Sequence, residues 1–363
     1  LQVIILVFAL VTASYTIPGG LSSVINTELI QSIILIAGSV LLTVLCAKSG
    51  GWEHIQTLLA NGDPAMKLIR PLDDPSTPWL GLILGMPILG LYFWGNNQTM
   101  VQRVLSAKTV DEGRKGILLN GALTLLTLVI IAIPGVMARK LFPGLEKPDM
   151  VYPSMLLNLM PVGLMGVMFA ALLAALTSAL SAILNSTSTL FTMDFYAKFD
   201  KKADGRKLVK AGKIASIIII VIATFWAPQI GKFGSLLKYY QEMLSYISPP
   251  IVAAFLLGIF NRRVNGKGIF WGLMAGLATA LFLLFNKTLV FGDLHFLLIV
   301  PFIFGFSVVI MYLVSLTAPK PTAEKLKNVT FTPEIIKGEK HSGYGLWACI
   351  LLLICIIILI MFA

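Results

Sequence analysis

Residues 170–196 read AALLAALTSALSAILNSTSTLFTMDFY, an apolar segment long enough to cross a membrane that ends in a run of hydroxyl and amide side chains. About 20 apolar residues suffice to span the hydrocarbon core of a bilayer. Because that core contains no water, polar side chains within it usually face a helix bundle, a cavity or an ion path. The segment therefore predicts a transmembrane helix with a functional polar face.

The composition of the whole chain agrees with this reading. Of its 363 residues 57% are hydrophobic and 12% charged, and the mean hydropathy is +0.88. These values are typical of a polytopic membrane protein and exclude a soluble globular domain. We expect about ten helical spans, near residues 1–16, 21–47, 78–101, 117–137, 159–192, 208–226, 235–261, 268–286, 291–317 and 343–362. Pro18-Gly19-Gly20 should break the first two spans apart, and Pro249-Pro250 should interrupt the seventh, either as a simple kink or as a functional break.

Lysine and arginine concentrate in the loops that follow the odd-numbered spans, for example in residues 198–213. The positive-inside rule places those loops in the cytoplasm. The net charge of +11 then reflects topology and contact with anionic lipid headgroups of the bilayer. We expect a multi-pass protein of the plasma (inner) membrane, with no nucleic-acid partner and no evident obligate protein partner. The scattered histidines and the absence of a catalytic triad or HExxH motif argue against an enzyme.

A stripe of mostly small residues follows one face of the helix in the opening segment. At about 100° per residue, the stripe contains Ala171, Ala175, Ser178, Ala182 and Asn185. Two interpretations remain open. The stripe either forms a close helix–helix contact of the small-xxx-small type, or it supplies oxygen ligands to a sodium ion together with a broken neighbouring helix.

Several long motifs in order resemble the sodium/solute symporter family, in its sodium-glucose cotransporter-like branch. They are YFWGNNQTMVQRVLSAKTVDEGRKG (92–116), LNSTSTLFTMDFYAKF (184–199) and YYQEMLSYISPPIVAAFLLGIFNRRVNGKG (239–268), preceded by YTIPGGLSSVINTELIQ (15–31). The resemblance implies an all-α LeuT-type inverted-repeat fold. Because the chain starts at Leu1 inside an apolar segment, we expect that the first core helices are missing.

The resemblance also implies a division of the single transmembrane domain, residues 1–363. Residues 1–77 would hold the remainder of the first repeat and an external loop. Residues 78–262 would form the second repeat, and residues 263–363 would be carboxy-terminal accessory helices.

By the same resemblance, the family's sodium site aligns with Ala175, Ser178 and Ala179. Ala175 can offer a backbone carbonyl and Ser178 a hydroxyl, but Ala179 stands where the family has a second hydroxyl. The loss of this oxygen would weaken sodium binding, its role would pass to Thr177 or Ser181, or the coupling ion would be a proton. An acidic residue thought to lie near the ion exit route aligns with Glu28, which could equally be an interfacial carboxylate.

The substrate contacts of the family are only partly matched. Gln241 matches a sugar-contacting glutamine, whose amide both donates and accepts hydrogen bonds. Phe93 replaces an inner-gate tyrosine and, like Trp94, would stack on a sugar or pack against neighbours. Other contacts that depart from the family pattern are Gly90, Thr124 and Ala182.

Together these features predict a secondary active transporter that couples sodium to the uptake of a small polar solute, such as a sugar or polyol. Sodium is expected as the transported coupling ion. The alternatives are a proton-coupled or passive carrier of another small organic solute, a channel, or a sensor that binds solute without moving it.

Overall fold

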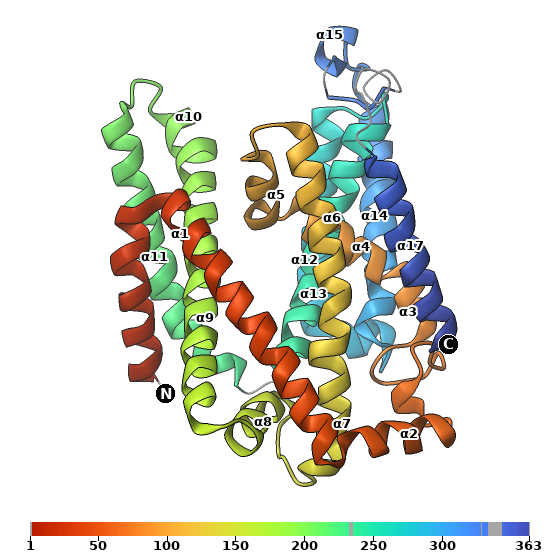
Figure 1. The fold of residues 1–363 in the computed structure, drawn as a ribbon. Coiled ribbons are helices and arrows are strands. Elements are labelled where there is room, and N and C mark those ends of the chain that lie inside the picture. Colours follow the sequence, from red (N-terminus) through yellow and green to blue (C-terminus); the bar gives the residue numbers. More distant parts are fainter. Residues whose placement is uncertain (1, 232–234, 328, 333–342, 363) are drawn as a thin grey trace. The chain divides into compact units, whose positions relative to one another are not determined.

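The computed structural model describes residues 2–231, 235–327, 329–332 and 343–362 (Figure 1). Within these residues nine helices are long and apolar enough to cross a membrane, and Val3–Thr12 is a shorter apolar segment. The only extended pairing described is an isolated bridge between Arg70 and Pro78. The predicted all-α polytopic fold is confirmed, with nine long candidate spans instead of ten in the described residues.

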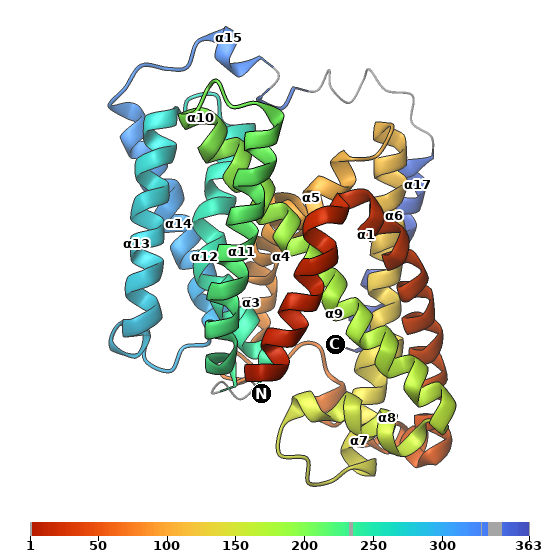
Figure 2. The same cartoon turned by 90° about the vertical axis from the view of Figure 1, so that its left-hand side faces the viewer.

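The difference in number arises at the start of the chain. One helix, α1 (Gln2–Cys46), covers both of the first two predicted spans. It bends sharply between its two arms (Figures 1 and 2). The predicted boundary at Pro18-Gly19-Gly20 therefore lies inside one assigned helix, because a bend redirects the chain without ending the helical hydrogen bonding.

Contacts within the chain define two compact units, and the first comprises residues 1–65 and 120–236. After α1 its elements are η1 (Ala47–Gly51), α2 (Trp52–Ala60), η4 (Leu128–Ala132), α7 (Ile133–Leu141), η5 (Pro148–Met150), α8 (Val151–Leu159), α9 (Val162–Leu190), η6 (Phe191–Tyr196), α10 (Ala197–Phe199) and α11 (Gly205–Ile230).

The second unit comprises residues 66–119 and 237–363. Its elements are α3 (Trp79–Leu84), α4 (Met86–Leu91), η3 (Tyr92–Asn96), α5 (Gln98–Leu105), most of α12 (Leu236–Phe260), α13 (Gly266–Phe291), α14 (Phe296–Leu316), α15 (Ala323–Leu326) and α17 (Tyr344–Met361). The helix α6 (Val110–Thr127) and the short η2 (Pro64–Met66) cross from one unit to the other. The predicted repeat boundaries divide the chain by its resemblance to the family and not by contacts, so they stay a prediction.

Four short segments, η1, η3, η4 and η6, are π-helical turns, each continuous with an α-helix. Such turns are rare in proteins, and those that occur are often found at functional sites. In η1 the helix also changes direction, because Gly50 adopts a φ of +94°. Only glycine occupies that region without steric cost. This corner lets α2 leave the line of α1 (Figure 1).

The core of the first unit is built by α1, α9 and α11. Ala9, Leu184 and Ile220, one from each helix, form a buried cluster. Further along α1, the hydroxyls of Ser39 and of Tyr152 on α8 lie 2.8 Å apart and share a hydrogen bond. Interfaces of this kind hold a membrane bundle together, since lipid supplies no hydrophobic drive for helix association.

The second unit is held by close packing of α13 against α14. Gly268, Gly272 and Gly276 recur every fourth residue on the side of α13 that meets α14. A Cβ atom at Gly272 would lie 2.8 Å from the backbone nitrogen of Met311. The small residues therefore let the two helix backbones approach each other.

The helix α12 contradicts the break predicted at its proline pair and leaves the simple kink as a prediction. Pro249 and Pro250 do not interrupt it, because the helix runs from Leu236 to Phe260 with both prolines inside and buried. Proline in a helix removes the hydrogen bond to the carbonyl four residues earlier. In membrane helices neighbouring side chains and small backbone adjustments tolerate that loss.

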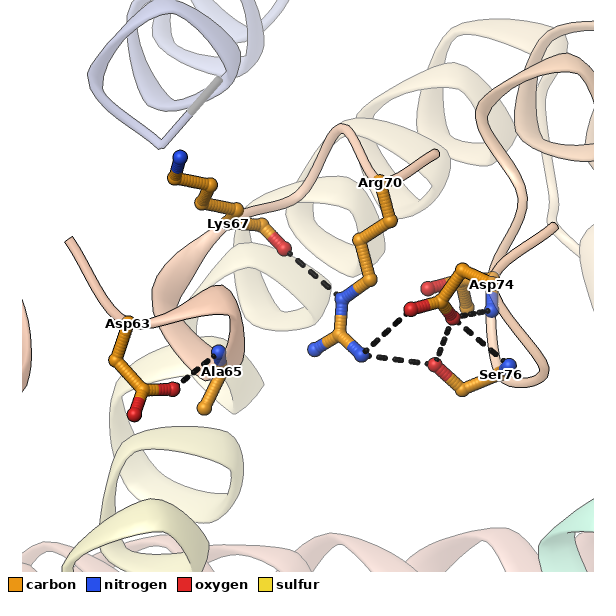
Figure 3. Close-up of polar contacts among 7 residues, drawn as sticks. Asp63, Ala65, Lys67, Arg70, Asp74 and Ser76 are labelled. Atoms are coloured by element: carbon orange, nitrogen blue, oxygen red, sulfur yellow. Dashed lines mark hydrogen bonds and ion pairs between the residues drawn. The ribbon is translucent and has the colours of Figure 1, made fainter. Parts of the chain in front are cut away.

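The loop between α2 and α3 is organised by polar contacts (Figure 3). The carboxylate of Asp74 accepts hydrogen bonds from the Ser76 hydroxyl at 2.5 Å and from the Ser76 and Thr77 backbone N–H groups at 2.8 and 2.9 Å. Arg70 lies 3.7 Å from the same carboxylate and donates to the Ser76 hydroxyl at 2.8 Å. These hydrogen bonds, with the Arg70 charge, lower the pKa of Asp74 from 3.8 to about 2.

Replacing Gly272 by alanine should destabilise the second unit, since the backbone of Met311 cannot move aside as a flexible side chain would. Overpacking of this kind costs about 1–3 kcal/mol. We expect a lower melting temperature of the purified protein in detergent. Gly305→Ala on α14 is the matched control, because a Cβ there meets open space. Equal melting of both variants would contradict the close-packing account.

The order of the Asp74 loop should depend on pH in one direction. The carboxylate pKa is lower in the folded loop, so its stabilising effect is complete above pH 3.8 and is lost as the pH falls toward 2. Asp74→Asn should mimic that loss at neutral pH and speed trypsin cleavage after Lys67. The control is Asp73→Asn, at an exposed neighbouring carboxylate. If both variants are cut at the wild-type rate, the Asp74 contacts do not order the loop.

Candidate functional site

The helix α9, which carries the polar face, has its start marked by a proline. Pro161 precedes the helix in an extended conformation, and α9 then runs without interruption from Val162 to Leu190. One side of this helix carries small alanine side chains, and Ala171 and Ala182 on that side are buried. The helix packs along α1 and α11 in the first unit. Part of the predicted stripe is therefore buried in the packing of α9, and the choice between a helix contact and sodium ligation stays a prediction.

The same contact contains a polar pair. The hydroxyl of Ser178 on α9 donates a hydrogen bond to Oε1 of Glu28 on α1. Both side chains are half-buried. A hydrogen bond to a carboxylate is stronger than one between neutral groups, particularly where water is scarce. Two residues predicted separately, one for the sodium site and one for the ion route, therefore meet between two helices.

The residues around Ser178 differ in what they can offer. Ala175, one turn earlier, is half-buried, whereas Ala179 is exposed and has no hydroxyl. The Thr177 hydroxyl donates to the Ala174 carbonyl of its own helix at 2.7 Å. Ser181 is fully buried. Two hydroxyls therefore lie near Ala179 in the sequence. That of Thr177 is bonded within its own helix, and that of Ser181 is buried inside the bundle.

Gln31 was missed by the sequence reasoning. It lies one turn after Glu28 on α1, and its Oε1 is buried with no hydrogen-bond partner in the described structure. Such an atom is unusual, because buried polar groups are almost always paired. A carboxamide oxygen is a good ligand for a hard cation. The signal in the sequence was a Glu and a Gln three residues apart in an apolar helix.

In the second unit, the predicted solute residues cluster around the π-helical turn η3. Phe93 and Trp94 form an edge-to-face pair with ring centroids 4.8 Å apart and an interplanar angle of 87°. Trp94 remains 48% exposed, which leaves much of its surface available. Gly90 precedes this turn in α4, and a Cβ there would meet open space. An aromatic face beside a small residue suits stacking on an apolar sugar face.

Gln241 lies on α12 of the same unit and is half-buried. Tyr92 of η3 and Leu244 of α12 pack against one buried cluster. Gln241 and Phe93 are therefore carried by elements that share a core.

Asn96 is a second residue that the sequence reasoning missed. Its Nδ2 is buried without a partner in the described structure. It lines a cavity of about 460 Å³ together with α5 and α12 side chains, among them Gln98 and Phe255. An amide just after an apolar run was the available signal. Its neighbour Asn97 has a structural role, because its Oδ1 caps α5 by accepting from the Thr99 N–H at 2.9 Å.

The two remaining predicted solute contacts belong to the first unit. The Thr124 hydroxyl donates to the Asn120 carbonyl of its own helix at 2.8 Å. Ala182 is buried in the α9 contact. The roles of both residues stay predictions.

The Ser178–Glu28 hydrogen bond should be measurable as a coupling between two helices. Ser178→Ala and Glu28→Gln should each destabilise the protein in sodium-free detergent, by about 1.5–3 kcal/mol for a bond to a charged group. The double variant should lose less than the sum of the two. Thr177→Val is the matched control, since that hydroxyl bonds within α9. Strict additivity in thermal unfolding would argue against the pair.

Comparisons with known proteins agree with this architecture. One relative, Sodium/glucose cotransporter 4 of Homo sapiens, is 34% identical over 90% of this chain and 55% of its own length. Sodium/mannose cotransporter SLC5A10 of Bos taurus is 31% identical over 95% of this chain and 68% of its own length. A third, Sodium/glucose cotransporter 1 of Mus musculus, is 37% identical over 75% and 47%. The chain thus spans about half the length of several curated relatives.

Among solved structures, a Na⁺-coupled sialic acid symporter in a substrate-bound outward-open state has a TM-score of 0.70 and 22% identity. The match covers 88% of this chain and 68% of that one. This likeness confirms the predicted LeuT-type fold. The model of the sodium:solute symporter family matches residues 1–276. The chain therefore belongs to the sodium:solute symporter family.

Proposed function

We propose that the protein is a secondary active transporter that couples the inward flow of sodium to the uptake of a small polar solute by alternating access. One observation carries the proposal, the hydrogen bond between Ser178 and Glu28 across α9 and α1. It joins a hydroxyl and a carboxyl oxygen inside a contact between two apolar helices. Ionisable groups in such a setting are costly and usually belong to an ion path.

Sodium would use oxygen atoms of three kinds in this region. The Ser178 hydroxyl and the Ala175 carbonyl lie one turn apart on α9, and the Glu28 carboxyl group faces Ser178 from α1. The unpartnered Gln31 oxygen on α1 is a further candidate. A cation without its water shell needs several such ligands. Ala179 removes one oxygen compared with the family pattern, and oxygen atoms of α1 would complete the set of ligands.

Coupling would follow from differential binding. Sodium would favour the outward-open state and solute would favour the occluded state, so each would raise the affinity for the other. One positive charge moving through 100 mV supplies about 2.3 kcal/mol. That alone supports roughly fiftyfold accumulation of a neutral solute.

A sugar or polyol is the proposed solute. The relatives are named for glucose and mannose, and Gln241 together with the Phe93–Trp94 pair supplies an amide and an aromatic surface. Gly90, Phe93, Thr124 and Ala182 depart from the family pattern. Because unmatched hydrogen-bond partners are what reject close analogues, the solute preference should differ from that of glucose carriers.

The proposed setting is the plasma membrane, with the basic loops in the cytoplasm. Within the transport cycle, residues 78–262 would act as the second repeat, residues 1–77 as part of the first, and residues 263–363 as accessory helices.

Uptake by the full-length protein in proteoliposomes tests the proposal. Labelled sugars and polyols are offered under sodium, lithium or proton gradients imposed one at a time. We expect saturable uptake driven by sodium, which falls at least tenfold in Ser178→Ala and in Glu28→Gln because a charge-assisted contact is lost. Thr177→Val should transport like the wild type, since its hydroxyl bonds within α9.

Other outcomes would replace the proposal with a different one. Uptake that follows the proton gradient would make the protein a proton-coupled carrier. Uptake indifferent to every gradient would make it a passive carrier, and solute binding without flux would make it a sensor.

A further inference from the structure

A histidine stands at the start of α14 in the second unit. His295 is the N-cap residue of this helix, and its Nδ1 accepts a hydrogen bond from the Leu297 N–H at 3.3 Å. The first N–H groups of a helix have no partner within the helix, so a cap of this kind satisfies one of them. A ring nitrogen that accepts a hydrogen bond carries no proton, so the imidazole is neutral in this arrangement.

The same side chain contacts the loop before α3. The Ser76 backbone hydrogen-bonds to the imidazole of His295. Ser76 belongs to the loop that Asp74 and Arg70 organise (Figure 3), and the bridge between Arg70 and Pro78 closes that loop. His295 therefore connects the start of α14 with a closed loop that lies more than 200 residues earlier in the sequence.

Two glycines hold α3 close to the same point of α14. A Cβ atom at Gly81 would lie 2.8 Å from the Cβ of Leu297, and one at Gly85 would lie 3.1 Å from the carbonyl carbon of Leu297. The two helices thus meet at the residue whose N–H is capped by His295. A change in the cap would therefore be felt on both sides of this contact.

The residues after the cap lead into the core that carries the predicted solute residues. Phe296 and Leu297 belong to the buried cluster against which Tyr92 of η3 and Leu244 of α12 pack. The turn η3 also carries the aromatic pair, and α12 carries Gln241. The start of α14 is therefore connected by direct packing to both elements.

The surroundings of His295 disfavour a positive charge. The side chain is half-buried, and this burial lowers its pKa from the ordinary 6.5, with further lowering by Lys287 of α13 and Lys238 of α12. Asp74 and the Ser76 backbone act in the opposite direction, but the pKa remains lowered. The N-terminus of a helix also carries a partial positive charge, which repels an imidazolium.

Protonation of His295 would break the cap. A proton on Nδ1 turns the acceptor into a donor that faces the Leu297 N–H, so the hydrogen bond can no longer form. Because the pKa in the folded protein lies below 6.5, the stabilising effect is complete above pH 6.5 and is lost as the pH falls below it. Asp74 stays ionised over this range, since its own pKa is about 2.

We propose that His295 is a pH-sensitive joint, which fastens the loop before α3 to α14 when it is neutral and releases the loop when it is protonated. The topology predicted from the basic loops places this end of the unit outside the cell, so the external pH would act on it. Release would loosen the packing of η3 and α12 and weaken solute binding, a last step that rests on the function proposed above.

Hydrogen exchange of the full-length protein in detergent tests the joint without any solute. Exchange of residues 70–79 and 296–300 is followed at about pH 8 and about pH 5, with labelling times scaled for the intrinsic pH dependence of exchange. We expect about fivefold faster exchange at the lower pH in the wild type, which is the effect of losing one N-cap. Equal protection at the two pH values would overturn the proposal.

Two variants separate the charge from the cap. His295→Asn keeps a capping side chain that does not titrate, so protection should be high at both pH values. His295→Ala removes the cap and should exchange rapidly at both. His54→Asn on α2 is the matched control and should keep the pH response of the wild type. A pH response that persists in His295→Asn would assign it to another group and overturn the proposal.

Solute uptake measured in parallel separates this inference from the proposed function. In the wild type we expect the KM for the solute to rise about fivefold at the lower external pH, in proportion to the lost cap, and in His295→Asn to stay constant. The expected exchange results without uptake at any pH would support the joint and overturn the proposed function. Uptake with a pH-independent KM would overturn the step from the joint to solute binding.

Discussion

The absence of water from the hydrocarbon core of a membrane is the constraint on which the rest of this structure depends. Any polar side chain there needs a partner within the protein or an occupant that it binds. Glu28 receives a hydrogen bond from Ser178 of another helix. The Asn185 Nδ2 and the Thr192 Oγ1 are buried without a hydrogen-bond partner among the described residues, and both residues line a cavity. The same rule thus produces a helix contact at one level of α9 and an opening at another.

Small residues set how closely the helices approach. In the first unit Ala171 and Ala182 are buried where α9 meets its neighbours. In the second unit Gly272 admits the backbone of Met311. Hydrogen bonds in these contacts are made across short distances that larger side chains would prevent. Small side chains and cross-helix hydrogen bonds therefore go together, because both depend on the close approach of the helices.

The sequence alone predicted the class of the fold, because apolar spans and positive loops are strong signals. It also named Ser178 and Glu28, but it could not predict their contact, since 150 residues separate them. It failed where local signals meet tertiary context. Pro249 and Pro250 predicted a break, yet α12 continues through them. Gln31 and Asn96 had only weak local signals, and the burial of the Gln31 Oε1 and Asn96 Nδ2 atoms without partners in the described structure is what singles them out.

The π-helical turn η6 changes the direction in which the side chains after it point, relative to those of α9. A π turn contains one residue more than an α turn. Everything after Tyr196 is therefore rotated by about 100° from where a continuous α-helix would place it. A deletion of one residue inside Phe191–Tyr196 would restore the α register. The side chains of α10 would then point about 100° away from their present directions while its composition stayed the same, so insertions and deletions here act as rotations of the helix end.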